Sequence, residues 1–138
     1  MRPPCTLAHH DLRALNICLA LGRGPLVLGF FVTGSSTCEQ VVDAEQALST
    51  RFPHIQFAAV AVRASHKSAA AAVRSHHWTI PVAYDADGAV GDIYGIEVCP
   101  IVELAYPSGR VRARLIGGHW VDRRALTGPV AALARATS

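Results

Sequence analysis

The sequence predicts an α/β domain in which helices cover both faces of a central mixed β-sheet. Two apolar runs of strand length, residues 25–32 and 55–62, contain no charged side chain. Such runs are typical of strands buried on both faces, as in the middle of an α/β sheet. Helical patterns separate these strands, and a strand pair joined by the turn 107–109 is followed by a closing helix. A strand–helix–strand unit in the N-terminal part of the chain and a hairpin followed by a helix in the C-terminal part together predict a mixed sheet.

The predicted elements follow the order α-β-α-β-α-β-α-β-β-α. Gly22 is expected to end the first helix, since glycine commonly follows a helix C-terminus. Ser36 and Glu39 stand at capping-box spacing at the start of the second helix. Gly128-Pro129 is expected to interrupt the last helix. The expected helices span residues 11–21, 37–52, 66–77, 89–94 and 121–136, and the expected strands span 25–32, 55–62, 79–84, 101–106 and 110–116.

Composition narrows the class of protein. With 138 residues the chain is expected to form one domain, residues 1–138, in which residues 1–10 are a loose N-terminal segment. Apolar residues make up 51%, which excludes disorder over the whole chain. The 13 basic and 10 acidic residues are spread along the chain without a basic stripe, so no nucleic-acid partner is expected.

The chain shows no targeting or membrane signal. Its first residues lack the apolar core and small-residue cleavage site of a secretory signal. The most apolar stretch, Leu12 to Val32, is interrupted by Arg23 and Pro25, so no membrane span is expected. We therefore predict a cytoplasmic protein.

The cysteines and histidines do not have the spacing of a metal site. In the cytoplasm the four cysteines are expected to be reduced, catalytic or inert rather than structural. No CxxC or Cys/His pair has zinc-ligand spacing. The adjacent histidines of each pair point about 100° apart on a helix, so both pairs are interpreted as solvated surface residues. No metal or other cofactor is expected. The residues concerned are Cys5, Cys18, Cys38 and Cys99, and the pairs His9-His10 and His76-His77.

Cys38 is the first candidate nucleophile. It follows the first buried strand and a polar turn, and it stands in the first turn of the predicted helix 37–52. Unpaired amides and the helix dipole stabilise a thiolate at such a position and lower its pKa. The alternative is a small buried hydrophobe, which is what most free cysteines are.

A second group of residues precedes the predicted strand 101–106. Pro100 stands at the head of this apolar strand, where a proline is tolerated if no ladder hydrogen bond is needed from it. A cis Cys99-Pro100 turn is one way to meet this requirement. Within the strand, Glu103 is either a proton acceptor for a buried thiol or an edge-facing or locally hydrogen-bonded carboxylate.

Both groups carry a resemblance to a known family. Residues 25–38 resemble the strand and active-site turn of the thioredoxin superfamily, nearest to the TlpA-like disulfide reductases and the alkyl hydroperoxide reductase/thiol-specific antioxidant (redoxin) group. Residues 84–109 resemble the Asp-x-Asp-Gly, Tyr-Gly and Pro segment of that group. The resemblance covers about residues 22 to 136. It implies a thioredoxin-like fold in which Pro100 is cis and faces the redox site.

The departures from the family pattern bear on function. The Cys-x-x-Cys window reads Ser35-Ser36-Thr37-Cys38, so serine replaces the attacking cysteine. A serine hydroxyl cannot take part in disulfide exchange. In the family the residue before the proline lies against the active-site turn, so Cys99 is implied as the partner thiol. Its Cα atom is then expected about 4.4–6.8 Å from that of Cys38. The resemblance also implies substrate contacts by Ser36, Thr37 and Val98.

Three functions stay open. The first is a thiol–disulfide oxidoreductase that uses a Cys38–Cys99 couple. The second is a peroxiredoxin-like thiol peroxidase, in which the hydroxyl of Ser35 binds peroxide and Cys38 attacks it. The motif proline of that family is replaced here by Phe31, and its active-site arginine by Pro100. Both differences argue against a peroxidase. The third is a non-catalytic binding module. The expected partner is a protein or small-molecule thiol or disulfide, or a peroxide, and a homodimer is left open.

Overall fold

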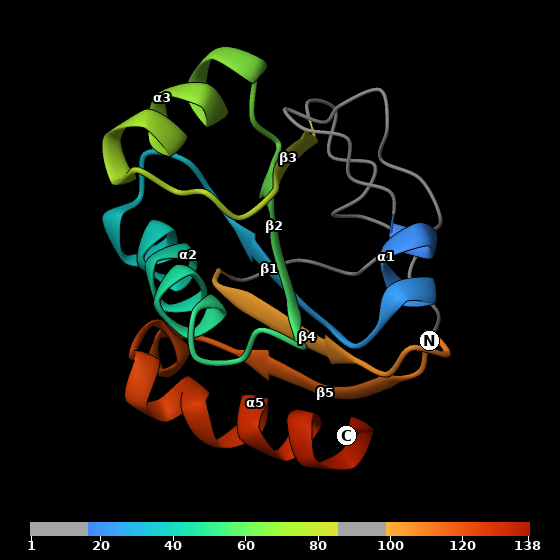
Figure 1. Cartoon of the computed structure of the whole chain (residues 1–138). Helices are drawn as coiled ribbons and strands as arrows, with labels where there is room; N and C mark the ends of the chain where they lie inside the picture. The colour runs from blue at the N-terminus through green and yellow to red at the C-terminus, as the bar shows by residue number, and fades with distance from the viewer. Residues whose placement is uncertain (1–16, 86–98) are drawn as a thin grey trace.

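The computed structural model describes residues 17–85 and 99–138, and an α/β architecture is present in them (Figure 1). Each buried apolar run forms a strand, and most predicted helices form close to their expected bounds. Within these two segments no helix is long and apolar enough to cross a membrane. The described elements are α1 (Ile17–Arg23), β1 (Leu26–Phe31), α2 (Ser36–Ser49), β2 (Gln56–Val62), α3 (His66–His76), β3 (Val82–Asp85), β4 (Ile101–Ala105), β5 (Val111–Ile116), the 3-10 helix η2 (Gly118–Val121) and α5 (Arg123–Thr137).

The sheet has the strand order β3-β2-β1-β4-β5. β1 pairs in parallel with β2, and β2 pairs in parallel with β3. β4 runs antiparallel to both β1 and β5. Every residue of β1 is buried, which fits a central strand. The predicted mixed sheet is therefore confirmed, and the carboxyl end of β1 lies beside the amino end of β4.

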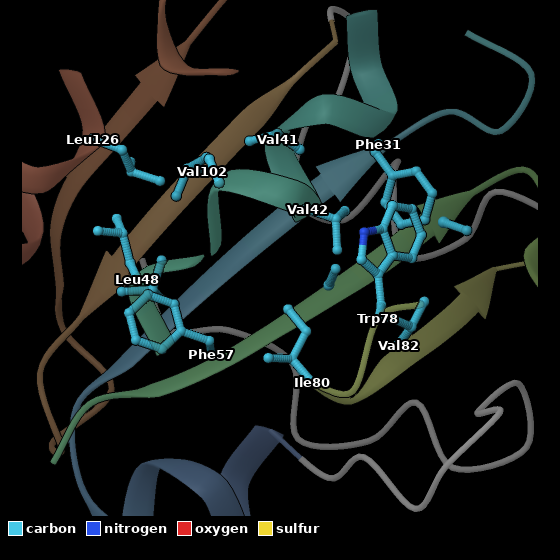
Figure 2. Packing of buried hydrophobic residues seen from close by; sticks show 14 of the residues in the cluster. Phe31, Val41, Val42, Leu48, Phe57, Trp78, Ile80, Val82, Val102 and Leu126 are labelled. Atoms are coloured by element: carbon cyan, nitrogen blue, oxygen red, sulfur yellow. The ribbon is translucent and has the colours of Figure 1, made fainter. Parts of the chain in front are cut away.

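Two apolar clusters cover the two faces of this sheet. Side chains of α2, α3 and α5 fill one cluster, in which Val27 and Phe31 represent β1. Side chains of α1 fill the other with Leu28 and Phe30, because successive residues of a strand point to opposite faces. In Figure 2 the ring of Phe31 lies beside the indole of Trp78, and their centroids are 5.4 Å apart. Helices therefore cover both faces, as the sequence predicts.

Several predicted boundaries are wrong. Helix α1 continues through Gly22 and ends at Arg23. Helix α5 passes through Gly128 and Pro129 without interruption, because burial of its apolar face against the sheet outweighs the hydrogen bond that proline cannot make. The sequence also gave no sign of η2. The predicted helix 89–94 and residues 11–16 of the first predicted helix lie outside the described residues.

Candidate functional site

Cys38 lies in the first turn of α2, where β1 delivers the chain through a short polar turn. The N-cap of α2 is Ser35 rather than Ser36, and its Oγ accepts a hydrogen bond from the Cys38 amide at 3.4 Å. The side chain of Cys38 is only 7% exposed and belongs to the cluster beneath α2. The predicted position of Cys38 is confirmed, and its environment combines an apolar surrounding with a helix N-terminus.

Cys99 reaches the same place from the segment that leads into β4. The Cys99–Pro100 peptide bond is cis, as expected. The next residue, Ile101, begins β4 and pairs with Phe30 of β1. The Pro100 carbonyl oxygen accepts a hydrogen bond from the Gly117 amide at 2.9 Å, which ties this segment to the end of β5.

A disulfide bond joins Cys38 to Cys99. The Sγ atoms are 2.08 Å apart and the Cα atoms 5.7 Å apart, across a sequence separation of 61. Cys38 is buried, whereas Cys99 is half-buried. In a disulfide whose two cysteines differ in accessibility, an attacking thiolate is expected to reach the sulfur of the more accessible cysteine, here Cys99.

The remaining predicted residues take different places. Ser36 and Thr37 are exposed in the first turn of α2. Val98 lies outside the described residues. Glu103 pairs with Leu28, so its side chain belongs to the sheet face opposite the one that contains Cys38. The structure therefore does not bring Glu103 to the thiol.

Glu103 has a local partner on that opposite face. It is 3% exposed, and its Oε1 lies 3.7 Å from Nε of Arg114 on β5. Burial raises the pKa of the Glu103 carboxyl, and the Arg114 guanidinium acts in the opposite direction. The structure does not support the proton acceptor for a thiol. It gives the Glu103 carboxylate a local ion-pair partner, although Glu103 Oε1 makes no hydrogen bond to any residue that the structure describes.

Glu45 is a buried acid to which the sequence analysis gave no role. Its side chain is 0% exposed, and neither carboxylate oxygen has a hydrogen-bond partner. Burial raises the pKa of Glu45 well above its ordinary value. The carboxyl group fills the space above Gly29 of β1, where an added Cβ would lie 3.0 Å from Glu45 Cδ. The signal in the sequence was an acid on the apolar face of a helix, opposite a glycine in a buried strand.

The interpretation of His76 as a solvated surface residue is wrong. Its Nδ1 lies 3.0 Å from Asp43 Oδ1, and its Nε2 lies 3.0 Å from Glu39 Oε1. The imidazole also stacks on Trp78, with ring centroids 4.6 Å apart and an angle of 18° between the planes. The neighbouring His77 is exposed, as expected. The two histidines differ because His76 ends α3 on the side that faces α2.

Two large apolar side chains are exposed at the carboxyl ends of β1 and β5, and Ile116 belongs to the sheet face opposite the one that contains Cys38. Val32 directly follows β1 and is 43% exposed. Ile116 ends β5, pairs with Ile101 and is 54% exposed. Within the described segments, no group of three histidine, cysteine or acidic side chains is arranged to hold a metal ion.

Solved structures of redox proteins share this fold. A putative thiol:disulfide interchange protein DsbE from Chlorobium tepidum superposes with a TM-score of 0.84 at 19% identity, over 96% of this chain and 95% of that one. The chain has the thioredoxin-like fold. A secreted Mycobacterium tuberculosis disulfide oxidoreductase gives a TM-score of 0.73 at 22% identity, over 83% and 86% of the two chains. Peroxidoxin BcpB from Mycobacterium tuberculosis gives 0.76 at 16% identity, over 92% and 90%.

The thioredoxin-like likeness is one of fold. At these identities the superpositions confirm the resemblance seen in the sequence at the level of architecture. Comparison with protein-family models gives no match, and comparison with curated proteins gives none either. The reaction therefore has to be argued from the residues of the site.

Proposed function

We propose that this thioredoxin-like protein is a thiol–disulfide oxidoreductase whose redox couple is Cys38–Cys99. The observation that carries the proposal is the disulfide between the helix α2 and the cis-proline segment. It supplies a partner thiol for Cys38 although Ser35 occupies the place of the first, attacking cysteine of the usual motif. General redox function is further supported by the thiol–disulfide enzymes among the structural neighbours.

The unequal exposure of the two cysteines suggests an order of events. A substrate thiolate attacks Sγ of the half-buried Cys99, and the Cys38–Cys99 bond breaks as the new bond forms. Cys38 leaves as a thiolate, which the N-terminus of α2 stabilises. The second thiolate of the same substrate then attacks the substrate sulfur that is bonded to Cys99. The substrate disulfide forms and Cys99 leaves as a thiolate. Two electrons pass from the substrate dithiol to the protein, and the substrate becomes a disulfide.

The solved structures that share this fold favour a polypeptide substrate. They include a putative thiol:disulfide interchange protein and a secreted disulfide oxidoreductase. We therefore propose protein thiols as the substrate class. The cytoplasmic location stays a prediction.

Redox equilibration tests the proposal. The protein is incubated in glutathione buffers of graded oxidised-to-reduced ratio, trapped with an alkylating agent and analysed by peptide mass spectrometry. We expect Cys38 and Cys99 to change together in one reversible, two-electron transition. Cys99→Ser should abolish that transition, and Cys18→Ser, the control, should leave it in place. A bond that neither reduces nor re-forms, or one that never exchanges with a reduced polypeptide, would contradict the proposal and favour a binding module.

A thiol peroxidase is the second candidate, and the likeness to peroxidoxin BcpB favours it. Ser35 accepts the Cys38 amide hydrogen with its Oγ, which leaves the hydroxyl hydrogen available to a peroxide. In that case hydrogen peroxide should convert Cys38 to a sulfenic acid in Cys99→Ser, and the intact protein should consume peroxide with a thiol reductant. Absence of both results would exclude the peroxidase.

A further inference from the structure

We propose that His76 is a positioning residue of the disulfide site, because its ring holds in place the carboxylate of Glu39, the residue that follows Cys38, and offsets its charge. The inference rests on the proposed thiol–disulfide function, since it concerns the thiolate of Cys38. It assigns a role to a side chain that lies outside the disulfide and outside the family motif.

The geometry forms a chain of contacts from α3 to the active-site turn. His76 Nε2 lies 3.0 Å from Glu39 Oε1. The other oxygen of the same carboxylate, Glu39 Oε2, accepts a hydrogen bond from the Gly34 amide at 2.9 Å. Gly34 stands in the turn between β1 and α2, and Glu39 directly follows Cys38. One carboxylate therefore links the imidazole to the backbone of the turn that presents the thiol.

The imidazole is held firmly on its other side. His76 Nδ1 lies 3.0 Å from Asp43 Oδ1, which also accepts a hydrogen bond from Trp78 Nε1 at 2.7 Å. The ring stacks on the same indole. Glu39 and Asp43 are separated by one turn of α2, so His76 bridges two acids on one helix face. A ring fixed by these contacts has little freedom to leave Glu39.

The number of protons on the ring decides whether it can donate a hydrogen bond to both carboxylates, those of Glu39 and Asp43. A neutral imidazole donates one hydrogen bond, whereas an imidazolium donates two. Burial acts to lower the pKa of His76, but hydrogen bonds and charge from Glu39 and Asp43 outweigh it and raise the pKa. These two carboxylates, both from α2, are the charged groups that act on the ring. The bridged arrangement therefore favours the imidazolium, which offsets negative charge beside Cys38.

The consequence concerns the reactivity of Cys38. An acid at the start of a helix and next to a cysteine opposes formation of the thiolate, because like charges repel. With His76 charged, the Glu39 carboxylate is compensated. With His76 replaced or neutral, one acid loses its partner and the Cys38 thiolate becomes less favourable.

The experiment measures alkylation of Cys38 in the reduced protein against pH, with peptide mass spectrometry to read Cys38 apart from the other cysteines. In His76→Gln the alkylation rate at pH 6.5 should fall roughly 3- to 10-fold. This is the size expected when the partly screened charge of the Glu39 carboxylate loses its counter-charge near the Cys38 thiolate. The wild-type profile should show two coupled steps, and the variant should show one. The control is His77→Asn at the adjacent exposed position, where asparagine tolerates the observed φ of 58°.

A second variant separates charge from packing. Glu39→Gln should raise the alkylation rate at pH 6.5, and in the double variant the effect of His76→Gln should largely disappear. A merely structural role of His76 would leave the two effects additive. The inference is overturned if His76→Gln alkylates like the wild type, or if Glu39→Gln leaves both rate and profile unchanged. Reversible Cys38–Cys99 exchange in glutathione buffers would persist in that case, whereas its loss in the wild type would instead refute the proposed function.

Discussion

Replacing Glu45 by methionine is expected to stabilise the protein. The side chain of Glu45 is fully buried and both of its oxygens lack a hydrogen-bond partner. A buried polar group without a partner costs about 1–3 kcal/mol. Methionine has a similar length and a flexible, apolar side chain that can occupy the same space above Gly29. At low pH, where the carboxyl is protonated, Glu45→Met should therefore raise the free energy of unfolding by about 1–3 kcal/mol.

The gain should increase with pH. In the unfolded chain Glu45 ionises around its ordinary pKa of 4.5, whereas burial raises its pKa well above that value in the folded protein. Between these two pKa values the folded state keeps a proton that the unfolded chain has lost, so stability decreases as pH rises. The slope is about 1.4 kcal/mol per pH unit for one group. The difference between variant and wild type should widen by that amount per unit, from pH 4.5 up to the folded pKa.

Urea unfolding of the oxidised proteins between pH 4.5 and pH 8 measures this effect. Each kcal/mol also corresponds to roughly 3–6 °C in Tm for a chain of this size. Gln40→Met, at an exposed position of the same helix, is the matched control and should give a difference that does not depend on pH. Parallel stability profiles for wild type and Glu45→Met, or a variant less stable at pH 7, would refute the reasoning.

Three further predictions concern the same region. Gly29→Ala should destabilise by about 1–3 kcal/mol, because its Cβ would overlap the Glu45 carboxyl, and calorimetry should find the loss suppressed in a Glu45→Ala background. Oxidised protein should be more stable to urea than reduced protein by about 4 kcal/mol, since the disulfide closes a loop with a sequence separation of 61. In Cys99→Ser, oxidising and reducing conditions should give the same stability. Ser35→Ala should cost about 1 kcal/mol of thermal stability through loss of the N-cap, and an unchanged Tm would contradict that role.

The sheet could be predicted from the sequence because its strongest signals are local. The runs 25–32 and 55–62 have no polar face to expose, so burial on both sides is their only stable solution. Helix ends were less certain, because tertiary packing decides them. Pro129 illustrates this: it removes a local hydrogen bond, yet α5 continues because Leu126, Val130 and Leu133 are buried against the core.

Some residues of the candidate site could likewise be predicted from the sequence, and others could not. Cys38 and the cis Cys99–Pro100 bond could be anticipated, since each lies within a short segment that resembles a known motif. His76 and Glu45 could not, because their surroundings depend on which helix faces meet. Two adjacent histidines look alike in a sequence, but only His76 faces the carboxylates of α2. The carboxyl of Glu45 fits against β1 because Gly29, which has no side chain, lies opposite it.

The position of the second cysteine changes what reduction does to the molecule. In a Cys-x-x-Cys motif both sulfurs belong to one helical turn, so the disulfide cross-links no distant segments and its reduction frees none. Here the bond joins α2 to the segment that enters β4, across a sequence separation of 61. Reduction therefore removes the cross-link between these two segments. Non-covalent contacts then hold them side by side, among them the pairing of β1 with β4 and the Gly117–Pro100 hydrogen bond. Since the oxidised chain has less conformational freedom to lose on folding, the redox state of the couple and the stability of this sheet junction are linked.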